Sequence, residues 1–487
     1  MIGLARLAGP IACLGLVLLL LARTRRDRLA GLGFAALGAA MLAAALAPSH
    51  WVEAVVGGIG GLAAGAALAA LFRRWPWLVP LLALACIPAR VGALGHQLLV
   101  PLYVVVAGAA VLLAWQLAHG DVRARELRRA AWPLAVYLAW VGLSMAWTQD
   151  ANEGATEILA FYLPFTVLAL SVARLQWSRG WLWAFYGELV AMGLVFSVVG
   201  FYQYETRNVF ENPKVIYSNA YAAFFRVNSV FWDPSIYGRF LVVAMVPSIV
   251  LVAASRSLKL AWGATLVLVV TWFGLLISFS QSSFAGLVVA VIGVAAVAWR
   301  WKALFAVVLA AAVLAGVAVA QPAVRRSIQH HTSAGLNSAS SGRYSLVANG
   351  IRIALAHPVR GVGVGGFKHA YARRVTRLHG KKNLSTAASH DTPVTVAAET
   401  GFVGLALFAW LLVGIGRDAW AGRHRIVSLS AGLGLAAILV HSLFYNDFFE
   451  DPTTWLLVGF VALAVPAALP LRQAVAPFEE EREAVPV

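Results

Sequence analysis

The sequence predicts an all-α integral membrane protein with about 12–15 transmembrane helices and one long, helical extracytoplasmic loop. Of its 487 residues, 61% are hydrophobic and only 12% are charged, and the mean hydropathy is +0.78. A soluble domain has roughly 25% charged residues, and a water-soluble fold of this length cannot bury so much apolar surface. The alternating segments of about ten residues that mark a membrane β-barrel are missing, so the spans are predicted to be helices.

Apolar stretches of about 17–22 residues recur along the chain, each long enough to cross about 30 Å of hydrocarbon as a helix. Their approximate centres are Leu16, Leu37, Leu62, Leu84, Gly108, Val141, Val167, Val190, Ala244, Val267, Val289, Leu309, Leu407, Leu435 and Gly459. We expect the first stretch to be a retained helix, because more spans follow at once and no small-residue cleavage site precedes a soluble domain. Cys13 and Cys86 both fall inside predicted spans, which excludes a disulfide framework and a cysteine-type metal site.

The connections between the spans alternate in charge, and this alternation predicts the orientation. Every second short connection is basic, at residues 23–28, 73–74, 123–129, 174–179, 256–259, 300–302 and 417–425. By the positive-inside rule these connections are cytoplasmic. The intervening ones, such as 149–157 and 446–451, are acidic or poor in basic residues and are therefore predicted to lie outside. The regular alternation also supports the list of spans, because one missed helix would place two basic connections on opposite sides of the membrane.

Two outer segments are too long to be turns, residues 203–240 and the loop 321–396. The second holds roughly eleven lysines and arginines and a single acid, Asp391. Long loops are exempt from the positive-inside rule, so the predicted orientation stands and the charge needs another explanation. We divide the chain into N-terminal transmembrane helices (1–202), a region that contains the long loop (203–470) and a cytoplasmic tail (471–487).

Within the long loop, residues 343–357 have the pattern of a short amphipathic helix at the membrane surface. Its apolar positions are Leu346, Ile351, Ile353 and Leu355, with Arg352 among them. The glycine cluster 361–366 then permits backbone conformations that other residues avoid. It lacks the Gly-Lys-Ser/Thr ending of a phosphate loop, so it does not predict a nucleotide site.

Several arginines on the outer face suit a pyrophosphate, because a guanidinium stays charged and pairs with two phosphate oxygens at once. Binding of anionic lipid headgroups is the alternative interpretation. His390 is the candidate for proton transfer, since imidazole exchanges protons near neutral pH, and Asp391 could orient its ring. The alternative is that the segment around His390 caps the following helix.

Glu399 is predicted to lie slightly inside the membrane, where an ionisable group is costly and is a functional candidate. Its alternative role is a structural partner for an arginine of the loop. No His-x-x-x-His, no Asp-x-Asp and no cluster of histidine with cysteine occurs, so neither a metal nor a cofactor is expected. Soluble nucleotide-binding domains are also missing, and no nucleic-acid partner is predicted.

The order of these motifs over about residues 220–465 resembles the O-antigen ligase and polymerase family. The motifs are Arg226…Phe231…Asp233-Pro234-Ser235, the serine turn 278–283, Arg343…Pro358…Gly361-Val362-Gly363…Gly365-Gly366-Phe367, and His390-Asp391…Glu399-Thr400-Gly401-Phe402-Val403-Gly404. This family includes ligases that attach polymeric glycans to a lipid core, repeat-unit polymerases and related protein O-glycosyltransferases.

The resemblance implies a metal-independent, inverting glycosyltransferase with a GT-C-like membrane fold in the bacterial inner membrane. Its donor would be an undecaprenyl-diphosphate-linked glycan at the outer face, and its acceptor a glycan or lipid hydroxyl among membrane lipids. By the resemblance, Arg343 binds the diphosphate and His390 activates the acceptor. Family members commonly carry an arginine where this chain has Gln281. Further diphosphate ligands are predicted at Arg226, Arg239, Arg352 and Arg360.

Two rival functions remain at this stage. A transporter or flippase for a lipid-linked glycan would use an interior polar path, often with inverted repeats and broken helices. We find no convincing internal repeat, and the outer polarity is concentrated in one loop, which favours the enzyme. A non-catalytic scaffold that binds anionic cell-wall polymer would not need His390.

Overall fold

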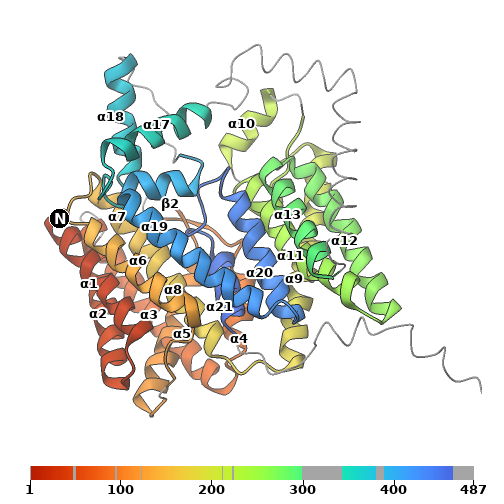
Figure 1. The fold of residues 1–487 in the computed structure, drawn as a ribbon, viewed down its shortest axis with the longest axis horizontal. Coiled ribbons are helices and arrows are strands. Elements are labelled where there is room, and N and C mark those ends of the chain that lie inside the picture. The colour runs from red at the N-terminus through yellow and green to blue at the C-terminus, as the bar shows by residue number, and fades with distance from the viewer. Residues whose placement is uncertain are drawn as a thin grey trace, which may run out of the picture.

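The computed structural model describes residues 2–47, 51–93, 96–121, 123–210, 212–221, 224–298, 343–379 and 389–463. These residues form a helical bundle (Figure 1). Its helices in the first half of the chain are α1 (Ile2–Leu21), α2 (Arg25–Leu46), α3 (Trp51–Arg74), α4 (Leu78–Ala85), α5 (Val100–Ala118), η1 (Arg128–Ala130), α6 (Ala131–Ser144), α7 (Ala151–Glu157), the π-helix η2 (Ile158–Tyr162), α8 (Leu163–Arg174) and α9 (Arg179–Thr206). Those in the second half are α10 (Pro213–Tyr221), α11 (Pro234–Ala254), α12 (Leu258–Ser278), α13 (Gln281–Ala298), α17 (Arg343–Ala356), α18 (Phe367–His379), α19 (Thr392–Ala421), α20 (Ile426–His441) and α21 (Pro452–Ala462).

The two strands of the described residues, β1 (Val91–Ala93) and β2 (His96–Leu98), form a small antiparallel hairpin with Val91 opposite Leu98. In the part of the chain that the structure describes, eight helical segments are long and apolar enough to cross a membrane: α1, α2, α5, the continuous segment Ala151–Arg174, α9, α11, α12 and α19. Shorter apolar helices follow the same pattern at α13, α20 and α21. The predicted class of an all-α, multi-pass membrane protein is therefore confirmed.

Every predicted span centre except one lies within a helix, and Leu309 falls outside the described residues. Two helix ends differ from the predicted loop limits, and the places where these loops enter the membrane stay a prediction. The long loop ends at Asp391, because the Asp391 side chain accepts a hydrogen bond from Val394 N at 2.9 Å and starts α19 there, five residues earlier than predicted. The other outer segment shrinks to residues 207–233, because α9 continues to Thr206 and Asp233 caps α11. The division of the chain at residues 202 and 470 stays a prediction.

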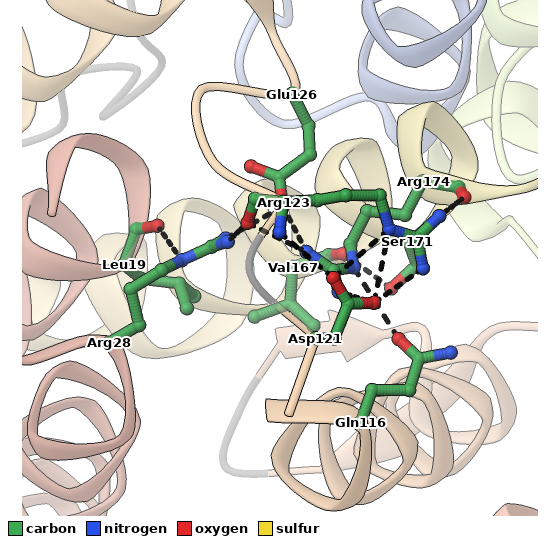
Figure 2. Close-up of polar contacts among 9 residues, drawn as sticks. All are labelled: Leu19, Arg28, Gln116, Asp121, Arg123, Glu126, Val167, Ser171 and Arg174. Carbon is green, nitrogen blue, oxygen red and sulfur yellow. Dashed lines mark hydrogen bonds and ion pairs between the residues drawn. The ribbon is translucent and has the colours of Figure 1, made fainter. Parts of the chain in front are cut away.

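Three of the loops predicted to be cytoplasmic meet in one buried polar network (Figure 2). Arg28 donates to the carbonyl of Leu19 at 3.0 Å and pairs with Glu126 at 2.8 Å. Arg174 pairs with the same Glu126 and with Asp121 at 2.6 Å. Because these residues come from the connections after α1, after α5 and after α8, the network shows that the three connections share one end of the bundle, as the charge alternation predicts.

The opposite end of the bundle holds the segments predicted to be outside. α1 links the two ends, since Leu19 belongs to the buried network while Arg6 donates to the carbonyl of Thr148 at 3.2 Å, in the turn between α6 and α7. Beyond this second end, α17, α18 and α10 project from the bundle at the top of Figure 1. The candidate site residues lie in or beside these projecting segments.

Candidate functional site

The glycine cluster predicted from the sequence forms a loop that inserts between α19 and the turn after α6. Gly361, Gly363 and Gly365 have φ values of 64°, 88° and 71°, a region that favours glycine. A Cβ on Gly363 would overlap the backbone of Thr148, and one on Gly361 would overlap the backbone of Glu399. These glycines are therefore required for close backbone contact and do not form a phosphate-binding loop.

The glycine loop also contacts α19 at the point where the helical conformation of α19 is interrupted. Gly401, at φ 71°, breaks the helical conformation, and the carbonyls of Ala398 and Glu399 accept hydrogen bonds from Val362 N (2.9 Å) and Gly363 N (2.8 Å). Backbone groups freed by the break are thus satisfied by the loop, as the membrane environment requires. The loop thereby fixes the outer part of α19, which begins immediately after His390, relative to α17.

Glu399 is buried at this break and has a backbone partner. One of its carboxylate oxygens accepts from Phe367 N at 3.1 Å, at the start of α18, where a negative charge is favourable. No arginine pairs with Glu399 among the described residues, and its alternative role as a partner for an arginine of the loop stays a prediction. Lys368, the next residue of α18, pairs instead with Glu153 at 2.5 Å.

A small cavity of about 30 Å³ lies beside Glu399. Its polar lining comes from Glu157, Thr392, Thr395, Glu399 and Glu450. Burial raises the pKa of Glu450 to about 7, and the Thr392 hydroxyl has no hydrogen-bond partner among the described residues. The cavity is large enough for one or two water molecules. Thr392 and Thr395 of its lining belong to the first turn of α19, which follows the His390 turn in the chain.

His390 occupies a strained turn immediately before the cap of α19. Its φ is 60°, uncommon for a residue with a side chain. Ser389 and Asp391 on either side carry the local hydrogen bonds: Ser389 Oγ accepts from Asp391 N at 3.1 Å, and Asp391 caps α19. The predicted capping role therefore belongs to the neighbours of His390. The Asp391 carboxylate bonds the backbone of α19, and no hydrogen bond from it to the imidazole is present in the described part of the chain.

The environment of His390 favours the uncharged form of its imidazole. Burial lowers its pKa, the positive charge of Arg343 lowers it further, and Asp233 raises it. The ring lies edge-on to Tyr445, with 6.0 Å between ring centroids. A neutral imidazole at neutral pH is the form that accepts a proton.

Arg226 belongs to the same group of charges. Burial lowers its pKa, Asp233 raises it and Arg343 lowers it. Asp233 and Arg343 therefore both lie close enough to act on Arg226 and on His390, although these residues come from three segments far apart in the chain. We call these four residues the outer cluster. Within the described residues, neither arginine of the cluster makes an ion pair with a carboxylate.

The position of Arg226 is fixed by hydrogen bonds on both sides. Its backbone N–H donates to Asn219 Oδ1 at 3.1 Å, and its Nε donates to the carbonyl of Ser278 at 3.2 Å. Val227 N donates to the carbonyl of Ile277 at 3.2 Å, which extends this contact. Arg226 thus lies against the serine turn that contains Gln281, whose own side chain is exposed at the start of α13.

The other predicted arginines lie elsewhere. Arg239 is 5% exposed and pairs with Asp451 at 2.8 Å and with Asp447, so its charge is matched inside the protein. Arg352 and Arg360 are exposed on α17 and after it. The structure brings none of the three into the outer cluster by a described contact, and their role as diphosphate ligands stays a prediction.

Asp233 and Tyr445 are site residues that the sequence analysis did not select. Asp233 was visible in the Asp-Pro-Ser motif, where a helix cap explains it equally well. Tyr445 lies in the acidic turn after α20, which is tied to the His390 turn by a hydrogen bond from Thr392 N to the carbonyl of Ser442 at 2.9 Å. The described residues include no group of three or more His, Cys, Asp and Glu side chains arranged to hold a metal ion.

Comparison with known proteins identifies a domain in this part of the chain. Residues 264–409 match the model of a family described as O-antigen ligase, and no curated protein matches the chain. The match covers less than a third of the 487 residues and includes Arg343, His390 and Glu399. It confirms the family resemblance that the motifs predict.

Proposed function

We propose that this O-antigen ligase-type membrane protein is a glycosyltransferase that uses the outer cluster as its active site. It would transfer a glycan from undecaprenyl diphosphate to a hydroxyl of a glycan or lipid acceptor on the outer face of the bacterial inner membrane. The observation that carries the proposal is the convergence of two arginines without carboxylate partners and one neutral imidazole, from three distant segments of the described chain.

In the proposed reaction, the acceptor oxygen attacks the anomeric carbon and forms the new glycosidic bond. The bond between that carbon and the diphosphate oxygen breaks, and the diphosphate leaves with the electron pair. His390 accepts the proton of the acceptor hydroxyl, so that no separate base is required. Attack from the face opposite the leaving group inverts the configuration. The proposed reaction uses no metal ion.

Arg343 and Arg226 supply the electrostatic part of the reaction. Negative charge accumulates on the diphosphate as the bond breaks, and a guanidinium placed there in advance stabilises that charge. Arg226 lies against the serine turn, so it is the best of the predicted residues to replace the arginine that family members carry at the position of Gln281. The buried ion pairs of Arg239 favour a positioning role for that residue.

A transfer assay with purified full-length protein and an undecaprenyl-diphosphate oligosaccharide tests the proposal. A ladder of longer glycans would identify a polymerase, and transfer to an added lipid or glycan would identify a ligase. We expect His390→Gln to reduce the rate by about 10²-fold or more, as the loss of a general base does. Arg343→Gln should reduce it comparably, with partial recovery in Arg343→Lys, which keeps the charge but not the planar fork.

His424→Gln is the matched control, since this histidine is exposed in the connection before α20, at the other end of the bundle. Full transfer activity in His390→Gln would exclude its role as the base. Movement of intact lipid-linked glycan across a vesicle membrane, with no transfer product, would support the transporter instead.

A further inference from the structure

A second basic site lies on the outer face, separate from the outer cluster. It is a cavity of about 370 Å³ between the C-terminal half of α17, the start of α18 and the turn after α6. Its lining residues are Gln149, Ile353, Ala356, His357, Ala370, Arg373 and Arg374. We call it the α17–α18 cleft.

The cleft has the charge of an anion site. Its lining includes two arginines and one histidine but no acidic residue. Arg374 Nε donates to Asn349 Oδ1 at 3.1 Å, which holds the guanidinium in place and leaves its terminal nitrogens without a hydrogen-bond partner among the described residues. Arg373 makes no described ion pair. Paired guanidinium groups at a polar cavity bind carboxylates and phosphates well.

Its geometry favours a soluble ligand over a lipid headgroup. Ile351 and Leu355 are 47% and 62% exposed, and they lie roughly opposite the cleft residue Ile353 around the axis of α17. This apolar face is the one that would contact the membrane surface. The cleft is on the other side of the helix, and α17 and α18 project beyond the bundle (Figure 1).

We propose that the α17–α18 cleft binds an anionic sugar of the glycan substrate, a uronic acid or a phosphorylated sugar. The inference rests on the proposed function and adds the chemical class of the glycan. Ten residues of α17 separate Ile353 from Arg343, which corresponds to about 15 Å along the helix. The cleft therefore holds a sugar at some distance from the reacting bond and acts on substrate selection.

Direct binding tests this inference without requiring transfer, so its outcome is independent of the proposed reaction. Full-length protein in phosphatidylcholine nanodiscs is titrated with trigalacturonic acid and with the neutral trisaccharide maltotriose. We expect the acidic trisaccharide to bind more tightly, with an affinity that falls as salt is added. Arg373→Gln and Arg374→Gln should each weaken its binding by about tenfold, the effect of one lost hydrogen bond to a charged group.

Two further variants distinguish charge from general damage. Lys214→Gln removes an exposed cation from α10 on the same face and should leave the affinity unchanged. Arg373→Lys keeps the charge and should retain part of the affinity even where Arg373→Gln unfolds the cleft. Equal binding of both trisaccharides, or equal losses in Lys214→Gln and Arg373→Gln, would overturn the proposal. Loss of trisaccharide binding in phosphatidylglycerol nanodiscs would identify lipid headgroups as the occupant and would also overturn it.

Discussion

Replacing Gly363 by alanine should separate the two halves of the proposed active site. Gly363 has φ 88°, and an added Cβ would overlap the backbone of Thr148, which cannot move aside as a flexible side chain could. The loop must then withdraw from the turn after α6. The contacts through which the loop holds α17 against α19 would then be lost.

The expected loss of stability follows from the backbone strain and from the hydrogen bonds that are lost when the glycine loop withdraws. An alanine in the left-handed region costs about 1 kcal/mol. The hydrogen bonds from Gly363 N to the carbonyl of Glu399 (2.8 Å) and from Thr148 Oγ1 to the carbonyl of Val364 (2.6 Å) would be lost, at about 1 kcal/mol each. The total is about 3 kcal/mol, a local destabilisation that moves Arg343 relative to His390.

Transfer activity and thermal unfolding of the purified variant measure the two consequences. We expect at least about a tenfold loss of transfer, because a misplacement of about 1 Å is sufficient for a loss of that size or larger. Gly416→Ala is the matched control, since Gly416 also belongs to the α19 segment but has nothing within 4 Å of an added Cβ. Unchanged activity and melting temperature in Gly363→Ala would refute the structural role assigned to the loop.

Three other predictions concern single charges. Because His390 has a lowered pKa, the transfer rate should be constant at neutral pH and fall only as the pH drops through that lowered value. Asp233→Asn removes the charge that raises this pKa and should move the fall to lower pH in a pH–rate profile. An unchanged profile would show that Asp233 does not act on His390. Arg174→Gln should reduce the free energy of unfolding by about 3 kcal/mol, the cost of breaking a buried pair, whereas Arg123→Gln, whose side chain is 46% exposed, should cost about 1 kcal/mol or less in the same denaturation experiment. Glu399→Gln should keep more stability and activity than Glu399→Ala, since an amide oxygen can still accept from the backbone at the start of α18; equal losses would show that the charge itself is required.

The membrane class was predictable because hydropathy and loop charge are local properties of the sequence. Each apolar stretch specifies a helix by itself, and the alternation of arginine-rich loops fixes which ends lie together. The alternation places these loops at the same end of the bundle, and there Arg28 pairs with Glu126 and Arg174 pairs with Asp121. Helix ends differ from the predicted loop limits where a single capping residue decides, as at Asp391.

The partners of the polar residues were not predictable, since they depend on how distant helices pack. Arg239 was a candidate ligand for diphosphate, but the structure pairs it with two acids more than 200 positions later in the chain. Glu399 was a functional candidate with an arginine partner as the alternative, and the partner that the structure gives it is a backbone N–H. No local pattern distinguishes an arginine with a buried carboxylate partner from one without.

The charges of the outer cluster provide the physical link between the candidate site and the proposed substrate. Burial, and after it the positive charge of Arg343, disfavours the charged forms of both Arg226 and His390, a cost in free energy that the negative charge of Asp233 opposes. The protein bears this cost because its backbone contacts fix each element separately: Asn219 and Ser278 hold Arg226, and the glycine loop holds α17. A diphosphate carries the opposite charge and would relieve the repulsion on binding. The same charge pattern keeps His390 neutral before the substrate binds, so one arrangement serves both diphosphate binding and proton acceptance.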